Sequence, residues 1–224
     1  MTLLTTRTAL LAGLAGLALT ASPAALAGPD DAGTWYASAL GGLTGMSGQR
    51  FDYTGPEGPS SLNLSMDPGV RAGAALGYQA SRHWRVEAEF AYQTVDHGGG
   101  DPSSGPGRAG GDYASTSFAL NGLYDFNLFG SDAVRTYAGV GLAWLTEVDV
   151  DFATTGGEES YSGDGFGVQL LAGARYDVGD RLFLDAGLRY LLASNVKLEA
   201  EGGDGRLQAD YEPWAVTFAI GWRF

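Results

Sequence analysis

Large apolar side chains alternate with small or polar ones over the last eleven residues of the chain. The apolar set is Trp214, Val216, Phe218, Ile220, Trp222 and Phe224. A period of two is that of a β-strand, whose side chains point alternately to its two faces. The segment therefore predicts a strand with one wide apolar face and one face of small or polar residues.

Seven earlier segments alternate in the same way, so we predict eight strands. They lie near residues 34–44, 70–79, 84–93, 113–126, 136–152, 166–176, 182–190 and 214–224. In the fifth strand the alternation puts Thr136, Ala138 and Val148 on the apolar face. Pro213 cannot donate a ladder hydrogen bond and predicts a local break in the pairing of the last strand.

The connections between these segments separate a membrane barrel from a soluble sandwich, which would also alternate. Three are short, near residues 80–83, 127–134 and 177–180, and four are long and polar, near 45–67, 96–112, 153–162 and 201–210. Strict alternation of short and long is typical of outer-membrane barrels, with short periplasmic turns and long extracellular loops. We therefore predict an all-β fold, an eight-stranded antiparallel up-and-down transmembrane barrel.

Aromatic residues gather at the strand ends beside the short connections. Amphipathic rings favour the boundary between membrane and water. The sequence thus predicts a periplasmic girdle of Trp35, Tyr78, Trp84, Tyr124, Tyr137, Tyr176 and Trp222.

The first 27 residues differ from the rest of the chain. Arg7 precedes an apolar run from Ala9 to Leu19, and Ala25-Leu26-Ala27 follows. A basic start, a short apolar run and a small-x-small end predict a cleaved signal peptide at 1–27 and a barrel at 28–224. The alternative is an uncleaved anchor helix, but the run is shorter than the roughly 20 residues that span a bilayer.

The charge and composition narrow the function further. One of 13 basic residues and none of 26 acidic residues lie in the leader, so the mature charge is 12 minus 26, or −14. This charge argues against nucleic acid as a partner. The chain has no cysteine, so no disulfide holds the fold, and 36 glycines beside 12% aromatics do not suit a disordered chain.

The carboxy-terminal pattern carries a family resemblance. Its spacing and terminal Phe resemble the signature that the barrel-assembly machinery reads in outer-membrane proteins, here Trp214, Phe218, Ile220, Trp222 and Phe224. Together with Ala75-Leu76-Gly77-Tyr78 and Tyr137-Ala138-Gly139-Val140-Gly141, it resembles the small porin-like group typified by the membrane domain of outer membrane protein A and by opacity-type adhesins. The resemblance implies export to the outer membrane of a Gram-negative bacterium.

The inward faces of the predicted strands carry charges of both signs. An eight-stranded barrel is just wide enough for its side chains to fill it. Buried charges must be paired, so we predict an ion-pair network that plugs the lumen. Its members are Arg71, Glu87, Glu89, Asp125, Arg175, Asp185 and Arg189. The alternative is a gated polar pathway in which the pairs rearrange.

The long connections are acidic. Between Glu147 and Asp164 the chain has six carboxylates and no basic residue. Such loops keep an exposed surface soluble, or bind divalent cations that bridge lipopolysaccharide phosphates. We expect outer-membrane lipid, lipopolysaccharide and host or envelope ligands as partners, a monomer, and no cofactor or metal.

One short motif raises the possibility of catalysis. Ser194-Asn195 resembles the serine motif of lipid A 3-O-deacylases, but Leu192 stands where that family has its general base. A serine without a base is a weak nucleophile, so we expect no enzyme. The predicted function is a structural or interaction role, in envelope integrity or adhesion. The alternative is a narrow gated channel or carrier for small solutes.

Overall fold

The computed structural model describes residues 32–46, 49–55, 58–64, 67–97, 111–130, 133–154, 157–200 and 206–224. The predicted signal peptide at 1–27 lies outside these residues. No helix in the described part of the chain is long and apolar enough to span a membrane.

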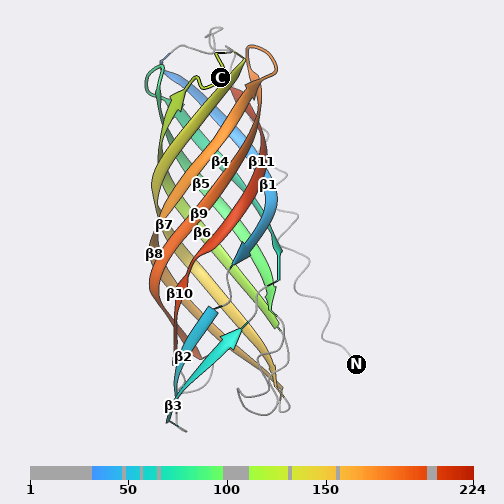
Figure 1. Ribbon diagram of the computed structural model, residues 1–224, viewed down its shortest axis with the longest axis vertical. Coiled ribbons are helices and arrows are strands. Elements are labelled where there is room, and N and C mark those ends of the chain that lie inside the picture. Colours follow the sequence, from blue (N-terminus) through green and yellow to red (C-terminus); the bar gives the residue numbers. More distant parts are fainter. Residues whose placement is uncertain are drawn as a thin grey trace.

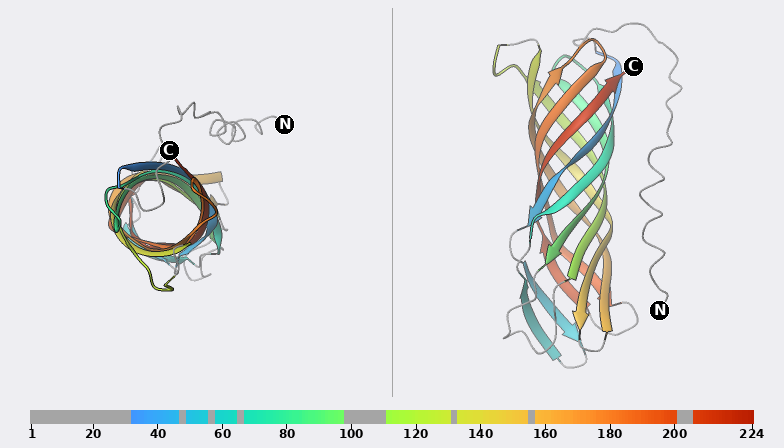
Figure 2. Two further views of the ribbon diagram at one scale, coloured as in Figure 1. Left: turned by 90° about the horizontal axis from the view of Figure 1, so that it is seen from above. Right: turned by 90° about the vertical axis from the view of Figure 1, so that its right-hand side faces the viewer.

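Eight antiparallel strands close into a barrel, as the alternation predicted (Figures 1 and 2). They are β1 (Thr34–Met46), β4 (Gly69–Gln79), β5 (Trp84–His97), β6 (Gly111–Phe126), β7 (Val134–Thr154), β8 (Gly157–Asp177), β9 (Leu182–Ala200) and β11 (Pro213–Arg223). Each strand pairs with the next. β11 pairs with both β9 and β1, from Tyr36 opposite Arg223 to Met46 opposite Pro213, and this pairing closes the ring.

Short connections lie at one end of the barrel, with the carboxy terminus beside them (Figure 1). They are 80–83, between β4 and β5, 127–133, between β6 and β7, and 178–181, between β8 and β9. Backbone hydrogen bonds close them, among them Ala80 N–H to Trp84 C=O at 2.9 Å and Val178 N–H to Leu182 C=O at 2.9 Å. These turns agree with the predicted short connections to within a residue or two.

The opposite end is more regular than the sequence predicted. Predicted loop 45–67 contains a hairpin of β2 (Gln49–Gly55) and β3 (Gly58–Leu64), and predicted loop 201–210 contains most of β10 (Arg206–Tyr211), which pairs with β9 and β2. The prediction of a loop at 153–162 is also wrong. Most of this segment is strand, because β7 and β8 pair as far as Thr154 opposite Gly157. These short strands are largely polar and have no continuous apolar face, so their composition resembles that of a loop.

The regular strand pattern is interrupted at two places. The ladder between β7 and β8 passes from Leu145 directly to Val148, and both side chains are fully buried. The prediction that Val148 lies on the apolar outer face is therefore wrong, because the bulge reverses the phase. In the last strand the predicted break is confirmed: β10 ends at Tyr211 and β11 begins at Pro213.

The outer surface carries the apolar face of the strands. Its exposed members include Trp35, Leu43, Leu76, Trp84, Phe118, Leu120, Tyr124, Val140, Leu142, Leu170, Tyr176, Leu188, Phe218, Ile220 and Trp222. So much exposed apolar surface fits a barrel whose solvent is hydrocarbon. Tyr137 is a correction to the predicted girdle. It is only 4% exposed, because its position in the alternation turns it inward. Thr136, also expected outside, is buried as well.

Two lumenal rings pack directly against glycines of the barrel wall. A Cβ added at Gly77 would lie 2.0 Å from Cζ of Tyr36, and one added at Gly221 would lie 2.0 Å from Cζ of Phe183. These contacts need a residue without a side chain.

Gly77→Ala is expected to lower the free energy of unfolding by about 1–3 kcal/mol, because the added methyl group overpacks the lumen. Urea unfolding of the barrel in lipid vesicles measures it. Gly179→Ala is the matched control, since a Cβ there meets nothing within 4 Å. Equal effects of the two changes would contradict the packing.

Candidate functional site

The middle of the described lumen contains buried charges of both signs in equal number. Four arginines and four carboxylates are buried in its polar part: Arg71, Arg85, Arg175, Arg189, Glu87, Glu89, Asp125 and Asp185. Four positive and four negative charges sum to zero. All seven residues of the network predicted from sequence lie here, together with Arg85.

Glu89 joins two arginines on opposite sides of it. Arg71 Nη2 lies 2.7 Å from Glu89 Oε1, and Arg189 Nη2 lies 3.0 Å from Glu89 Oε2. Arg71 Nη1 also donates to Gln93 Oε1 at 2.6 Å, and Arg189 donates to the Thr217 hydroxyl. One carboxylate thus ties β4 to β9 through β5, across the lumen.

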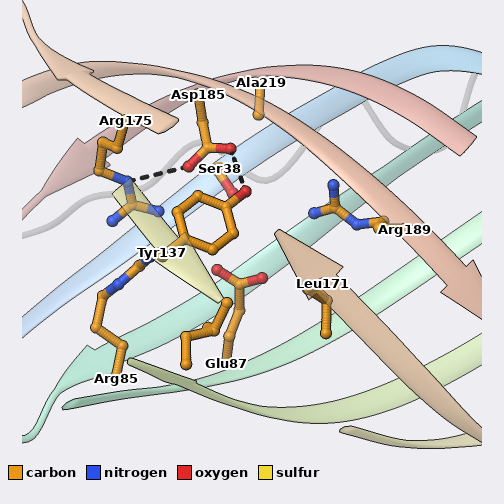
Figure 3. A pocket seen from close by; sticks show the side chains of 10 residues that line it. Ser38, Arg85, Glu87, Tyr137, Leu171, Arg175, Asp185, Arg189 and Ala219 are labelled. Carbon is orange, nitrogen blue, oxygen red and sulfur yellow. Dashed lines mark hydrogen bonds and ion pairs between the residues drawn. The ribbon is translucent and has the colours of Figure 1, made fainter. Parts of the chain in front are cut away.

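Two further ion pairs lie nearer the short turns. Arg85 Nε lies 2.8 Å from Asp125 Oδ2, and Arg175 Nε lies 3.2 Å from Asp185 Oδ2. The Tyr137 hydroxyl donates to the other oxygen of Asp185 at 2.7 Å (Figure 3). Here the inward-facing Tyr137 completes a buried pair instead of contributing to a girdle.

Two aromatic rings that sequence reasoning missed support the arginines. The Tyr36 hydroxyl donates to Glu87 at 2.8 Å and accepts from Arg85 Nη1 at 3.1 Å. The Arg175 guanidinium lies 3.8 Å from the centroid of Phe183 and 4.5 Å from that of Tyr36, in cation–π contact. The alternation could have predicted that both rings point inward, since each directly follows an outward residue of its strand.

Little space remains among these groups. The cavity between them has a volume of about 10 Å³, about what a single water molecule needs. Figure 3 shows Arg85, Glu87, Arg175, Asp185 and Arg189 converging on it. One polar atom beside the cavity has no hydrogen-bond partner: Arg85 Nη2, which is buried.

Apolar side chains fill the lumen towards the long-loop end. They are Met46, Val95, Tyr113, Leu145, Val148, Ala193 and Tyr211, all buried. The rings of Tyr113 and Tyr211 stack with their centroids 5.2 Å apart. The Tyr211 hydroxyl lies 2.6 Å from Ser115 Oγ and accepts from Gln93, which links this apolar collar to the polar network.

The end beside the short turns carries a third polar group. Asp177 pairs with Arg135 at 2.8 Å and also with Arg223. The C-terminal strand β11 is thereby fixed to β7 and β8 through its last residue, Arg223.

Several residues considered from sequence lie away from this site. His83 is exposed in a short turn and stacks on Tyr124 with centroids 5.7 Å apart. Leu192 faces outward. The side chain of Ser194 lies outside the described residues. So do the side chains of residues 150–161, which are most of the acidic segment between Glu147 and Asp164. Among the residues that the structure describes, no group of three potential metal ligands is found.

Comparison with known proteins agrees with this architecture. Residues 9–224 match the family described as the outer membrane protein beta-barrel domain. Outer membrane protein W of Salmonella typhi is 25% identical over 206 residues, which are 84% of this chain and 97% of that protein.

Two solved structures have the same fold. The outer membrane protein OprG from Pseudomonas aeruginosa has 17% identity and a TM-score of 0.62, over 87% of this chain and 97% of that one. The outer membrane protein AlkL, determined in DMPC lipid bilayers, has 18% identity and a TM-score of 0.60, over 91% and 95%.

Proposed function

Because the chain belongs to the outer membrane protein beta-barrel domain family, we propose that it is an anchor of the bacterial outer membrane with a closed lumen and an interacting extracellular end. Residence in the outer membrane is the family's property. The closed lumen and the interaction role are our proposals, and the role is non-catalytic.

The paired charges in the middle of the lumen are the observation that carries this proposal. Each of the four arginines forms an ion pair, and the space left among them has the volume of about one water molecule. An ion that crossed this region would have to separate buried pairs, which is costly in a low-dielectric interior. The apolar collar adds a second obstacle towards the long-loop end.

The length of β7 and β8 supports the interaction role. Each strand has 21 residues, whereas about 9–11 tilted residues cross a membrane. On the outer face the stacked rings of Trp144 and Phe166, 6.0 Å apart, are followed by exposed Glu147 and Asp164. We place the membrane boundary at this change. The part of the hairpin beyond this boundary then lies outside the membrane, where lipopolysaccharide, other envelope components or host ligands would meet it.

The outward residues of β11 support one further part of the proposal. Trp214, Phe218, Ile220 and Trp222 of β11 are exposed, as is Phe224 directly after the strand. We propose that the barrel-assembly machinery reads this strand during insertion. The closed ring needs no second copy, and we expect a monomer.

Planar-bilayer conductance tests the closed lumen. The refolded protein is expected to give no unitary steps, because an ion would have to separate the buried pairs of the network. Heat-modifiable migration on a gel verifies that the barrel has folded.

A narrow channel is the competing function, and the same measurement distinguishes it. Reproducible steps whose size changes in Glu87→Gln or Arg189→Gln would overturn the plug and favour a gated lumen. Asp180→Asn, in an exposed turn, is the control for charge changes away from the lumen.

A further inference from the structure

The connection between β6 and β7 carries two large apolar side chains away from the barrel wall. Leu128 is 69% exposed and Phe129 is 66% exposed. In both views of Figure 2 the yellow-green connection after β6 stands out from the ring instead of folding across its opening. Apolar groups in such a position favour leaving water.

The other two short turns have a different composition. The turn from Ala80 to His83 presents Ser81, Arg82 and His83, and the turn after β8 presents Val178 with Gly179, Asp180 and Arg181. Only one of these residues is a large apolar one. The adjacent Leu-Phe pair is thus particular to the connection between β6 and β7 among the described short turns.

Two hydrogen bonds connect the two sides of this turn at its base. The Thr136 hydroxyl donates to the Phe126 carbonyl at 2.6 Å and accepts from the Leu128 N–H at 3.3 Å. The threonine lies at the start of β7, so it fixes both sides of the turn base. Leu128 therefore leaves the barrel in a defined direction.

The apolar outer face of β6 leads directly to the pair. Phe118, Leu120, Tyr124 and Phe126 are exposed on this face in sequence order towards the turn. Trp84 packs on Tyr124 with ring centroids 5.0 Å apart, and rings of this kind mark the membrane–water interface. Leu128 and Phe129 continue the lipid-facing surface past these rings.

We propose that Leu128 and Phe129 form an interfacial anchor, inserted among the headgroups and upper acyl chains of the periplasmic leaflet. The continuity with the face of β6 favours lipid over a periplasmic protein as the occupant. The anchor would fix the depth and rotation of the barrel in the membrane from a point outside the wall.

Site-directed fluorescence tests the anchor, and the natural absence of cysteine makes single-site labelling direct. Phe129→Cys would carry an environment-sensitive nitrobenzoxadiazole label in vesicles of phosphatidylcholine and phosphatidylglycerol. We expect emission at shorter wavelength than from Asp180→Cys in the polar turn. Quenching should be stronger by nitroxide lipids labelled near the headgroup than by those labelled near the chain end. Leu170→Cys, on the outer face of β8 and four residues from Phe166 along the strand, should show the reverse preference.

A label at residue 129 that behaves like the one at 180 would overturn the proposal, since the vesicles contain no other protein that could cover the pair. Thr136→Val supplies a second measurement. It removes the hydroxyl and should reduce the quenching of the label at 129, while the label at 170 stays unchanged. An unchanged signal at 129 would show that the hydrogen bonds of Thr136 do not orient the anchor.

Discussion

Glu89→Ala is expected to lower the free energy of unfolding by about 3–5 kcal/mol, the usual cost of removing one partner from a buried ion pair. Glu89 is the only carboxylate within ion-pair distance of Arg71 and Arg189 among the described residues. Its loss leaves two buried guanidinium groups with neutral partners, Gln93 and Thr217. Chemical unfolding in lipid vesicles, followed by tryptophan fluorescence, measures the change.

Two further variants separate charge from packing. Glu147→Ala removes an exposed carboxylate and should be nearly neutral. Replacing the whole group, as Arg71→Met, Glu89→Leu and Arg189→Met together, should cost less than Glu89→Ala alone, because no unpaired charge remains. A larger loss in the triple variant would mean that shape, and not charge balance, holds this part of the lumen together.

Leu170→Arg is expected to lower the free energy of unfolding by about 2–4 kcal/mol, the cost of an arginine facing lipid near the bilayer midplane. Leu170 is 45% exposed and pairs with Val140 and Tyr190 on neighbouring strands. Its side chain points outward, four residues from Phe166 and six from Tyr176 along β8. The same unfolding experiment in vesicles measures the loss.

Val178→Arg is the matched control for the lipid-facing substitution. Val178 is similarly exposed, at 50%, but lies in a short turn beside Asp180 and Arg181. Arginine there should be tolerated. If both variants are equally stable, the outer surface does not face hydrocarbon at Leu170.

The alternation of side chains was enough to predict which residues enter the lumen, but not which of them meet. Glu89 is 18 residues from Arg71 and 100 from Arg189 in the sequence. Their contact depends on strand register and stagger around the ring, which one sequence does not define. The burial of the charges therefore followed from the pattern, and the bridging role of Glu89 required the structure.

Two errors have identifiable causes. Tyr137 was assigned to the girdle from its place near a strand end, although its neighbour Ala138 faces outward and alternation directs Tyr137 inward. Val148 was assigned to the outer face by continuing the alternation along β7, but the bulge after Leu145 reverses the phase of that alternation. Position along a strand and phase across it are separate signals, and phase is reliable only between bulges.

The pairing of the first barrel strand with the last has a consequence for the order of events during biogenesis. Tyr36 and Arg223 lie opposite each other although 223 minus 36, or 187, residues separate them. The ring cannot close until the end of the chain has been delivered, and contacts between distant residues form slowly. Until then β1 and β9 would present unpaired edges, which invite association with other chains. A nascent chain that lacks β11 is therefore expected to need a holding chaperone, and its lifetime in the periplasm should be governed by aggregation and proteolysis.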